Sequence, residues 1–433
     1  MSGDDGSSSS SSSSSNSRAY SINLLKQAFK EYYFNHTHLV EAPDAIQERE
    51  FGYSRFDGTM VRHLSMRDRR ELVALLMVNV PADMYCSTAY YTSPSRPMEE
   101  KGLKGADLIF DIDIKELKPR CSAMHDIRIC EECSEELHDQ STACGRCGSS
   151  RVNHVIMPCN ECISLGKREV KKLVEILVDD FGVDGEGDDG SGGIRVYFSG
   201  NYGFHVYVKG RYTTLDSAAR REIVDYMLGR GLMDALTRRY GRRGRRGRKG
   251  AYGRGRGRSK RRSMGGRGRG VGTNDAGYSD GGEEVGGNDP LHIPASILAA
   301  EGYGWMGRIG RYLGAERVSM KSVEDAILAL SVKVDPNVTM DMHRIFRLPG
   351  TLNSKSSLAK VPLMISEIDS FDPFEDACFI SDREVGVHVV RAPRFTLKGN
   401  VFGPYAHEDV KLPLYAASYL ICKGLAYVKQ PPA

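Results

Sequence analysis

Apolar residues recur with helical spacing in several segments of the chain. In the clearest segment, residues 167–181, an apolar residue returns at every third or fourth position and so forms one face of a helix. The same spacing predicts helices that begin near Ser21 and cover residues 69–79 and 321–330. Residues 412–428 are also apolar with helical spacing, a pattern compatible with core packing or with a partner surface.

Alternating apolar residues predict strands elsewhere. Residues 106–114 alternate in this way, so Asp111 and Asp113 point to the same face of the predicted strand. Residues 194–198 and 204–208 form two more predicted strands, which a glycine-containing turn joins. Helices and strands are interleaved along the chain, and this predicts an α/β fold with a mixed sheet, flanking helices and a small zinc-binding module.

Two segments have compositions that cannot form a core. Residues 1–17 contain nine consecutive serines, which predicts a disordered tail. Residues 238–290 are rich in glycine, and residues 238–270 hold 16 basic residues and no acidic one, so we interpret 238–290 as a disordered insertion. The rest of the chain has 44 basic against 56 acidic residues. One basic segment on an acidic body favours a polyanionic partner such as nucleic acid, with a passive linker as the alternative.

The apolar content also bounds the class of protein. Hydrophobic residues make up 40% of the 433 residues, enough for a sizeable core. The longest apolar run, residues 71–80, is too short to span a bilayer, and the N-terminus lacks the apolar segment of a signal peptide. We therefore expect neither a membrane protein nor a secreted disulfide scaffold, but a chain in the reducing cytoplasm.

Six of the ten cysteines form three Cys-x-x-Cys pairs. The pairs are Cys130/Cys133, Cys144/Cys147 and Cys159/Cys162. In a reducing compartment this pattern indicates zinc rather than disulfides. The first two pairs have the spacing of a self-contained zinc ribbon, Cys-x2-Cys-x10-Cys-x2-Cys.

Three short segments carry residues suited to catalysis. Asp111 and Asp113 repel each other unless a cation lies between them, so they fit a divalent metal site; a solvated edge strand is the alternative. The glycines of Ser199-Gly-Asn-Tyr-Gly-Phe-His205 let backbone N–H groups approach a phosphate, although an ordinary glycine hairpin has the same pattern. Residues 334–355 combine carboxylates, cations and a Leu-Pro-Gly turn, which suits a nucleoside triphosphate; a solvated helix ending in that turn is the alternative.

In this order, these segments resemble the small catalytic subunit of archaeal and eukaryotic DNA primases. The blocks that carry the resemblance are Arg49-Glu-Phe-Gly52, Val61-Arg-His63, Phe110-Asp-Ile-Asp113, Ser199-Gly-x-x-Gly-x-His205 and Ile345-x-Arg-Leu-Pro-Gly350. The resemblance implies the primase-polymerase fold and a DNA-directed RNA polymerase that makes primers for replication on single-stranded DNA, from nucleoside triphosphates, by two-metal nucleotidyl transfer. It also implies a heterodimer with a large primase subunit, in the cytoplasm of an archaeal cell and associated with the nucleoid.

The resemblance implies roles for individual residues as well. Asp111, Asp113 and a third aspartate would hold two Mg²⁺ or Mn²⁺ ions. The third falls on Asp335, with Asp341 as the fallback. The residues implied to bind or border the nucleotide are Ser199, His205, Arg347, Lys355, Glu50 and Arg62.

The family carries one structural zinc near its active site. Here His154, Cys159 and Cys162 match its position, and Cys121 is the natural fourth ligand. His125 competes with His154 for that role. The ribbon of Cys130, Cys133, Cys144 and Cys147 would then be an insertion that holds a second zinc.

Two positions depart from the family pattern: Tyr202 stands where a basic residue is common, and Asn353 stands where a histidine is common. The domains expected are a catalytic domain of residues 18–120 and 163–433 and a zinc-binding segment of residues 121–162. Two other functions compete with primer synthesis. One is primer extension in repair by a related polymerase, and the other is non-catalytic nucleic-acid binding, which the intact aspartates argue against.

Overall fold

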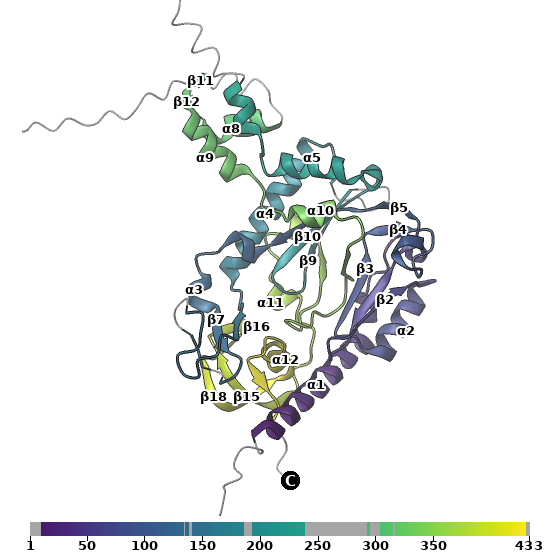
Figure 1. The fold of residues 1–433 in the computed structure, drawn as a ribbon, viewed down its shortest axis with the longest axis vertical. Coiled ribbons are helices and arrows are strands. Elements are labelled where there is room, and N and C mark those ends of the chain that lie inside the picture. The colour runs from purple at the N-terminus through teal and green to yellow at the C-terminus, as the bar shows by residue number, and fades with distance from the viewer. Residues whose placement is uncertain are drawn as a thin grey trace, which may run out of the picture. The chain divides into compact units, whose positions relative to one another are not determined.

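The structure, a computed structural model, describes residues 10–133, 135–137, 141–185, 193–238, 292–294, 304–314 and 317–429. The chain divides into a larger unit, Met1–Leu228 with Ser331–Ala433, and a smaller unit, Gly229–Leu330. The predicted tail up to residue 9 and the predicted insertion at 239–290 lie outside the described residues. The predicted α/β class is confirmed by the sheets and flanking helices of the larger unit (Figure 1).

One four-stranded sheet contains the predicted aspartate strand. Its order is β14 (Val361–Leu363), β9 (Gly193–Phe198), β10 (Gly203–Lys209) and β6 (Leu108–Asp113). Each neighbouring pair is antiparallel, and the register places Asp111 of β6 opposite His205 of β10. The apolar residues of β6 are buried, whereas Asp111 and Asp113 are partly exposed, as the alternating pattern predicts.

Helix α4 (Asn160–Asp179) packs against β6 and β10. It contains most of the predicted helix of residues 167–181 but begins earlier. Gly166 lets the added part of the helix pack closely, because a Cβ atom there would lie 2.8 Å from the Ile114 side chain and 2.9 Å from that of Phe204. The helix therefore approaches the sheet more closely than a larger residue would allow.

A second four-stranded sheet has the order β13 (Ile345–Arg347), β3 (Asp83–Ser87), β1 (Phe51–Ser54) and β2 (Met60–Leu64). These pairs are also antiparallel. Helix α2 (Arg69–Asn79) has the predicted bounds, and the Asp68 side chain caps it by accepting hydrogen bonds from the N–H groups of Arg70 and Glu71.

The two ends of the described chain meet. Helix α1 (Ser10–Asn35) runs beside α2 and the C-terminal helix α12 (Leu414–Cys422) (Figure 1). Because α1 begins at Ser10, residues 10–17 differ from the predicted tail. Once the amphipathic part from Ser21 is helical, extending the helix costs less than starting one. Helix α12 is almost wholly buried, so of the two interpretations of residues 412–428 the structure supports core packing.

The C-terminal sheet has β15 (Glu384–Ala392) between β18 (Tyr405–Pro413) and β19 (Ala426–Tyr427).

The smaller unit contains β11 (His292–Pro294), α8 (Gly304–Leu313), β12 (Arg317–Ser319) and α9 (Met320–Leu330), of which α9 confirms the helix predicted at 321–330. Further helices whose bounds the structure describes are η1 (Thr37–Leu39), η2 (Ile46–Glu48), η3 (Met98–Glu100), η4 (Ile114–Leu117), α3 (Ser122–His125), η5 (Arg211–Thr214), α5 (Ser217–Met227), α10 (Pro336–Met340), η6 (Ile365–Glu367) and α11 (Pro373–Asp376). The other strands are β4 (Ala89–Tyr91), β5 (Leu103–Ala106), β7 (Ile127–Cys130), β8 (Val152–Val155), β16 (Phe395–Leu397) and β17 (Asn400–Phe402). Among the described residues, no helix combines the length and apolar character needed to cross a membrane.

Candidate active site and metal clusters

Three aspartates influence one another at the end of β6. Asp335 caps α10, and its N–H donates a hydrogen bond to the main-chain carbonyl of Asp111 at 3.1 Å. Burial, together with the charges of Asp113 and Asp335, raises the pKa of Asp111 to about 7. Asp341 instead lies 3.7 Å from the Arg344 guanidinium and accepts a hydrogen bond from the N–H of His343. The geometry therefore favours Asp335 over Asp341 as the third carboxylate.

A fourth carboxylate, Glu116, belongs to the same electrostatic group. Burial and the charges of Asp335 and Asp113 raise its pKa above the ordinary value. Sequence reasoning missed Glu116, because a single acid in a short connection has no distinguishing pattern. Carboxylates that raise one another's pKa gain stability from a bound cation, and oxygen ligands are those that Mg²⁺ and Mn²⁺ prefer.

A cavity of about 650 Å³ opens beside these carboxylates. The predicted site residues that line it are Asp111, Asp113, Ser199, His205, Arg347 and Lys355. The structure thus brings together side chains separated by more than 200 positions in the sequence. Asp335, Glu50 and Arg62 are not among the lining residues.

In the lining of the same cavity, Asp83 holds Arg347. Its carboxylate lies 2.5 Å from the Arg347 guanidinium and accepts two hydrogen bonds from Ser354. Burial alone would raise the pKa of Asp83, but the Arg347 charge and the Ser354 hydrogen bonds hold it below the ordinary value. Arg347 also donates to the carbonyl of Leu352 at 2.8 Å, so its orientation is fixed. Sequence reasoning missed Asp83, whose only signal was an acid at the start of an apolar strand.

The turn between β9 and β10 needs both of its glycines. A Cβ atom on Gly203 would lie 2.4 Å from the Ile112 carbonyl oxygen, and Gly200 has a φ of +85°. The Ser199 side chain remains in the cavity lining. The Tyr202 hydroxyl instead donates to the Cys162 sulfur at 3.6 Å, so this side chain joins the turn to a cysteine cluster.

His205 is neutral in this environment. Burial, together with the charges of Lys360 and Arg347, lowers its pKa well below the ordinary value. Its Nε2 lies 3.6 Å from Asp111 Oδ1, and its ring packs edge-on against Phe346. A neutral imidazole donates one hydrogen bond and accepts another without adding charge.

Glu50 and Arg62 form a separate polar group. The buried Glu50 carboxylate lies 2.5 Å from the buried Lys101 ammonium and 3.0 Å from Arg62 Nε, and it accepts a hydrogen bond from the His63 N–H. Lys101 was not predicted as its partner. This network anchors Arg62, whose side chain remains one-third exposed.

Four residues whose ligand atoms all lie within 4.8 Å of one another form what we call the inner cluster: Cys121, His125, Cys159 and Cys162. Three sulfurs and an imidazole are a zinc-type donor set. The Nδ1 atom of His125 lies 2.9 Å from Asp126 Oδ1, and such a hydrogen bond to a carboxylate commonly orients a histidine ligand.

The inner cluster corrects the choice of His154 as a ligand. His154 is nearly half exposed, its Nε2 lies 3.5 Å from Asp126 Oδ2, and it lines the cavity. His125 ends the short helix α3 one turn after Cys121, which brings both residues to the same metal position, whereas His154 lies on strand β8. The structure therefore supports the competitor, His125.

A second group, which we call the outer cluster, consists of Cys130, Cys133, Cys144 and Cys147. Their sulfurs also lie within 4.8 Å of one another, and Cys147 is exposed. Backbone N–H groups of Cys147 and Arg146 lower the pKa of Cys144 to about 7, which favours the thiolate form that binds metal. This cluster has the predicted ribbon spacing and could hold one metal ion.

The arrangement defines a class of enzyme. Carboxylates, cations and a glycine turn around one cavity provide for a triphosphate and the ions that accompany it. Such a site suits transfer of a nucleotidyl group.

Comparison with known proteins identifies the family. The family described as DNA primase small subunit matches residues 110–365. The chain is 38% identical to the DNA primase small subunit PriS of Nitrosopumilus maritimus, over 94% of this chain and 98% of that protein. It is 38% identical to PriS of Cenarchaeum symbiosum over 93% and 97%, and 32% identical to PriS of Methanococcoides burtonii over 93% and 97%. The chain belongs to the DNA primase small subunit family, which confirms the catalytic primase function in replication predicted from its motifs and does not favour the repair alternative.

Proposed function

We propose that this chain builds RNA primers on single-stranded DNA, with nucleoside triphosphates as substrates and a large primase subunit as its partner. The observation that carries the proposal is one cavity whose lining contains both the carboxylates of Asp111 and Asp113 and the cations of Arg347 and Lys355. Family membership supports the choice of reaction, and the basic residues of the segment 238–270 support a nucleic-acid template.

Asp111, Asp113 and Asp335 are the proposed ligands of two divalent ions. Asp111 and Asp113 line the cavity, and Asp335 contributes its negative charge from beside the Asp111 backbone. Bound Mg²⁺ or Mn²⁺ would activate the attacking hydroxyl and stabilise negative charge on the α-phosphate. The three carboxylates would hold the ions close to His205, whose Nε2 lies 3.6 Å from Asp111 Oδ1.

The donors and cations of the same cavity are proposed to hold the triphosphate. Ser199 and the glycine turn offer hydroxyl and N–H donors, and Lys355 and Arg347 offer positive charge. Asp83 keeps Arg347 in one orientation, and neutral His205 can donate a hydrogen bond to an oxygen near Asp111. Glu50 positions Arg62, which we propose to border the nucleotide outside this cavity.

Both cysteine clusters are proposed zinc sites. The inner cluster fits a structural zinc with three sulfur ligands and one imidazole, and the outer cluster fits a four-cysteine ribbon. On this proposal the chain holds two zinc ions in addition to the catalytic divalent ions.

Primer-independent synthesis on bare single-stranded DNA tests the function. We expect labelled ribonucleotides to be joined without a primer, and we expect Asp111→Asn to reduce the rate at least about 100-fold, because one charge of the metal site is lost. Asp341→Asn is the matched control and should retain activity, since Asp341 pairs with Arg344. Synthesis only from an added primer would instead support a repair enzyme. Normal activity of Asp111→Asn in both magnesium and manganese would refute the metal assignment.

A further inference from the structure

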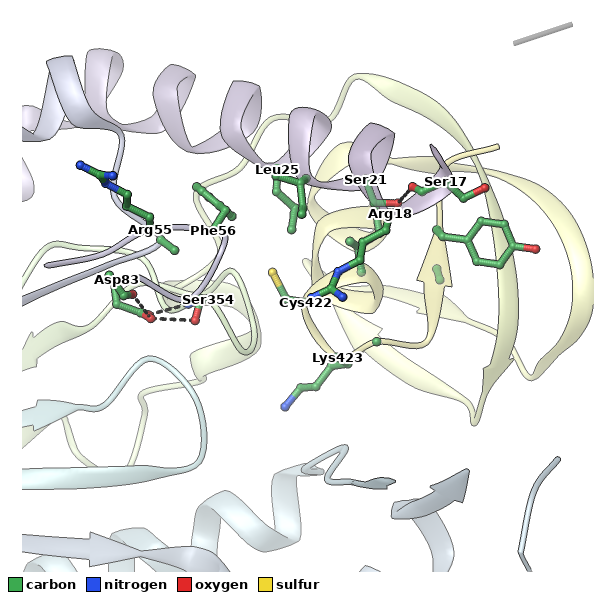
Figure 2. Close-up of a pocket in the computed structure, with 18 of the residues that line it drawn as sticks. Ser17, Arg18, Ser21, Leu25, Arg55, Phe56, Asp83, Ser354, Cys422 and Lys423 are labelled. Atoms are coloured by element: carbon green, nitrogen blue, oxygen red, sulfur yellow. Dashed lines mark hydrogen bonds between the residues drawn. The ribbon is translucent and has the colours of Figure 1, made fainter. Parts of the chain in front are cut away.

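Lys423 reaches the catalytic cavity from the C-terminal end of the chain. It follows α12 and lines both the catalytic cavity and a neighbouring cavity of about 1160 Å³. Figure 2 shows the Lys423 side chain leaving the end of this helix with its ammonium directed away from α1. The same figure shows Asp83 hydrogen-bonded to Ser354 among the residues that line the neighbouring cavity, and the Asp83 carboxylate also accepts from Arg347.

The Lys423 ammonium contacts the glycine turn. Its Nζ donates a hydrogen bond to Asn201 Oδ1 at 3.0 Å, two residues after Ser199. It also lies 5.4 Å from the centre of the Tyr419 ring. Within the described part of the chain, no carboxylate forms an ion pair with it, so its charge is not neutralised where it meets the cavity.

The rest of the cavity has few cations to offer. The turn itself, residues 199–203, contains no basic residue. Arg347 is already paired with the buried Asp83 carboxylate, which offsets its charge. Lys355 and Lys115 also line the cavity, but Lys115 directly follows the strand that carries the carboxylates Asp111 and Asp113. A triphosphate carries several negative charges, and charged donors bind it more strongly than neutral ones.

We propose that Lys423 is a further nucleotide-binding residue, whose ammonium contacts the triphosphate beside Asn201. The C-terminal segment thereby adds to a site whose lining comes from β3, β6, β8, β10, β13 and the loops beside them. This inference rests on the proposed function and adds to it a residue far from every recognised motif.

The electrostatics of Lys423 agree with such a role. Burial, opposed in part by the charges of Cys422 and Asp126, lowers its pKa to about 8. A partly buried ammonium without an ion pair is unfavourable, and a bound phosphate would provide the missing negative charge. The site is thus more favourable for Lys423 when the nucleotide is present.

The test measures primer synthesis on a homopolymeric single-stranded DNA template while the matching nucleoside triphosphate is varied. For Lys423→Gln we expect the KM for nucleotide to rise about tenfold, the effect of losing one charge-assisted hydrogen bond, with a much smaller change in kcat. Lys423→Arg keeps the charge and should recover most of the affinity. Lys429→Gln is the matched control, because Lys429 pairs with Asp409 and lines only the neighbouring cavity.

An unchanged KM in Lys423→Gln would overturn the proposal, as would equal impairment of the glutamine and arginine variants, which would indicate a packing role. Thermal unfolding of each variant shows whether the fold is retained. If Lys423→Gln unfolds, Asn201→Ala replaces it: removing the ammonium's partner should raise KM by a smaller factor, and no rise would refute the contact.

Binding of a fluorescent adenosine triphosphate analogue separates this proposal from the proposed function. Weaker binding by Lys423→Gln supports the contact even if the wild-type chain fails to make primers without help. Equal binding by the wild type and by Lys423→Gln counts against the contact even if primer synthesis is normal.

Discussion

The inner and outer cysteine clusters differ in the separation of their ligands and in what surrounds them. The inner ligands come from two separate segments, the start of α4 and the short helix α3 with its N-cap, whereas the outer ligands lie between the last residue of β7 and the start of β8. Three of the four inner ligands are buried, and the same is true of only two outer ones. A metal ion would thus join distant segments at one site and close a local loop at the other.

The inner cluster also contacts a residue of the cavity lining. Cys162 accepts a hydrogen bond from Tyr202 in the glycine turn, and Cys159 precedes the first residue of α4, which packs on the sheet that carries Asp111. Cys130 and Cys144 of the outer cluster pack with Leu137 in a small apolar group apart from the main core. The difference predicts that loss of the inner site would affect catalysis more than loss of the outer one.

The largest effect is expected from Cys162→Ser. Loss of a buried ligand should release one zinc, destabilise the fold by about 4 kcal/mol or more and abolish most primer synthesis. Cys144→Ser should also release one zinc but leave most of the activity. Zinc content by atomic spectroscopy, thermal unfolding and synthesis rate measure these effects.

Cys378→Ser controls for loss of a buried thiol outside both clusters and should keep both zinc ions. Equal damage from the Cys162 and Cys144 variants would contradict the distinction between the clusters. A stoichiometry near one zinc in the wild-type chain would show that only one of them holds metal.

A more specific effect is expected from the two histidines beside Asp126. His125→Ala should lower the zinc content to about one per chain, because His125 completes the inner donor set. His154→Ala should keep two zinc ions, since its ring lies against Asp126 and in the cavity lining. The reverse result would restore His154 as the ligand.

The smallest effect is expected from Tyr202→Phe, which removes only the hydroxyl that joins the turn to Cys162. One hydrogen bond to sulfur is worth about 1 kcal/mol, so kcat/KM for nucleotide should fall severalfold while the zinc content stays at two. Tyr53→Phe is the control, because its hydroxyl bonds Asn79 outside both sites. Unchanged kinetics in Tyr202→Phe would show that the inner cluster does not influence the turn through this contact.

The sequence alone determined the features that depend on neighbouring residues. Alternation placed Asp111 and Asp113 on one face of β6, helical spacing set α2 at 69–79, and Cys-x2-Cys spacing defined the outer ribbon. These patterns repeat over a few positions, so the local geometry of helix, strand or loop is enough to interpret them.

Only the tertiary structure decided the contacts between distant segments. It chose His125 over His154, paired Asp83 with Arg347 and Glu50 with Lys101, and brought Lys423 to Asn201, 222 positions away. Each of these side chains belongs to an ordinary local pattern, and its partner is set by how sheets and helices pack. A buried charge must find its counterpart in space, and the order of residues along the chain does not record where that counterpart lies.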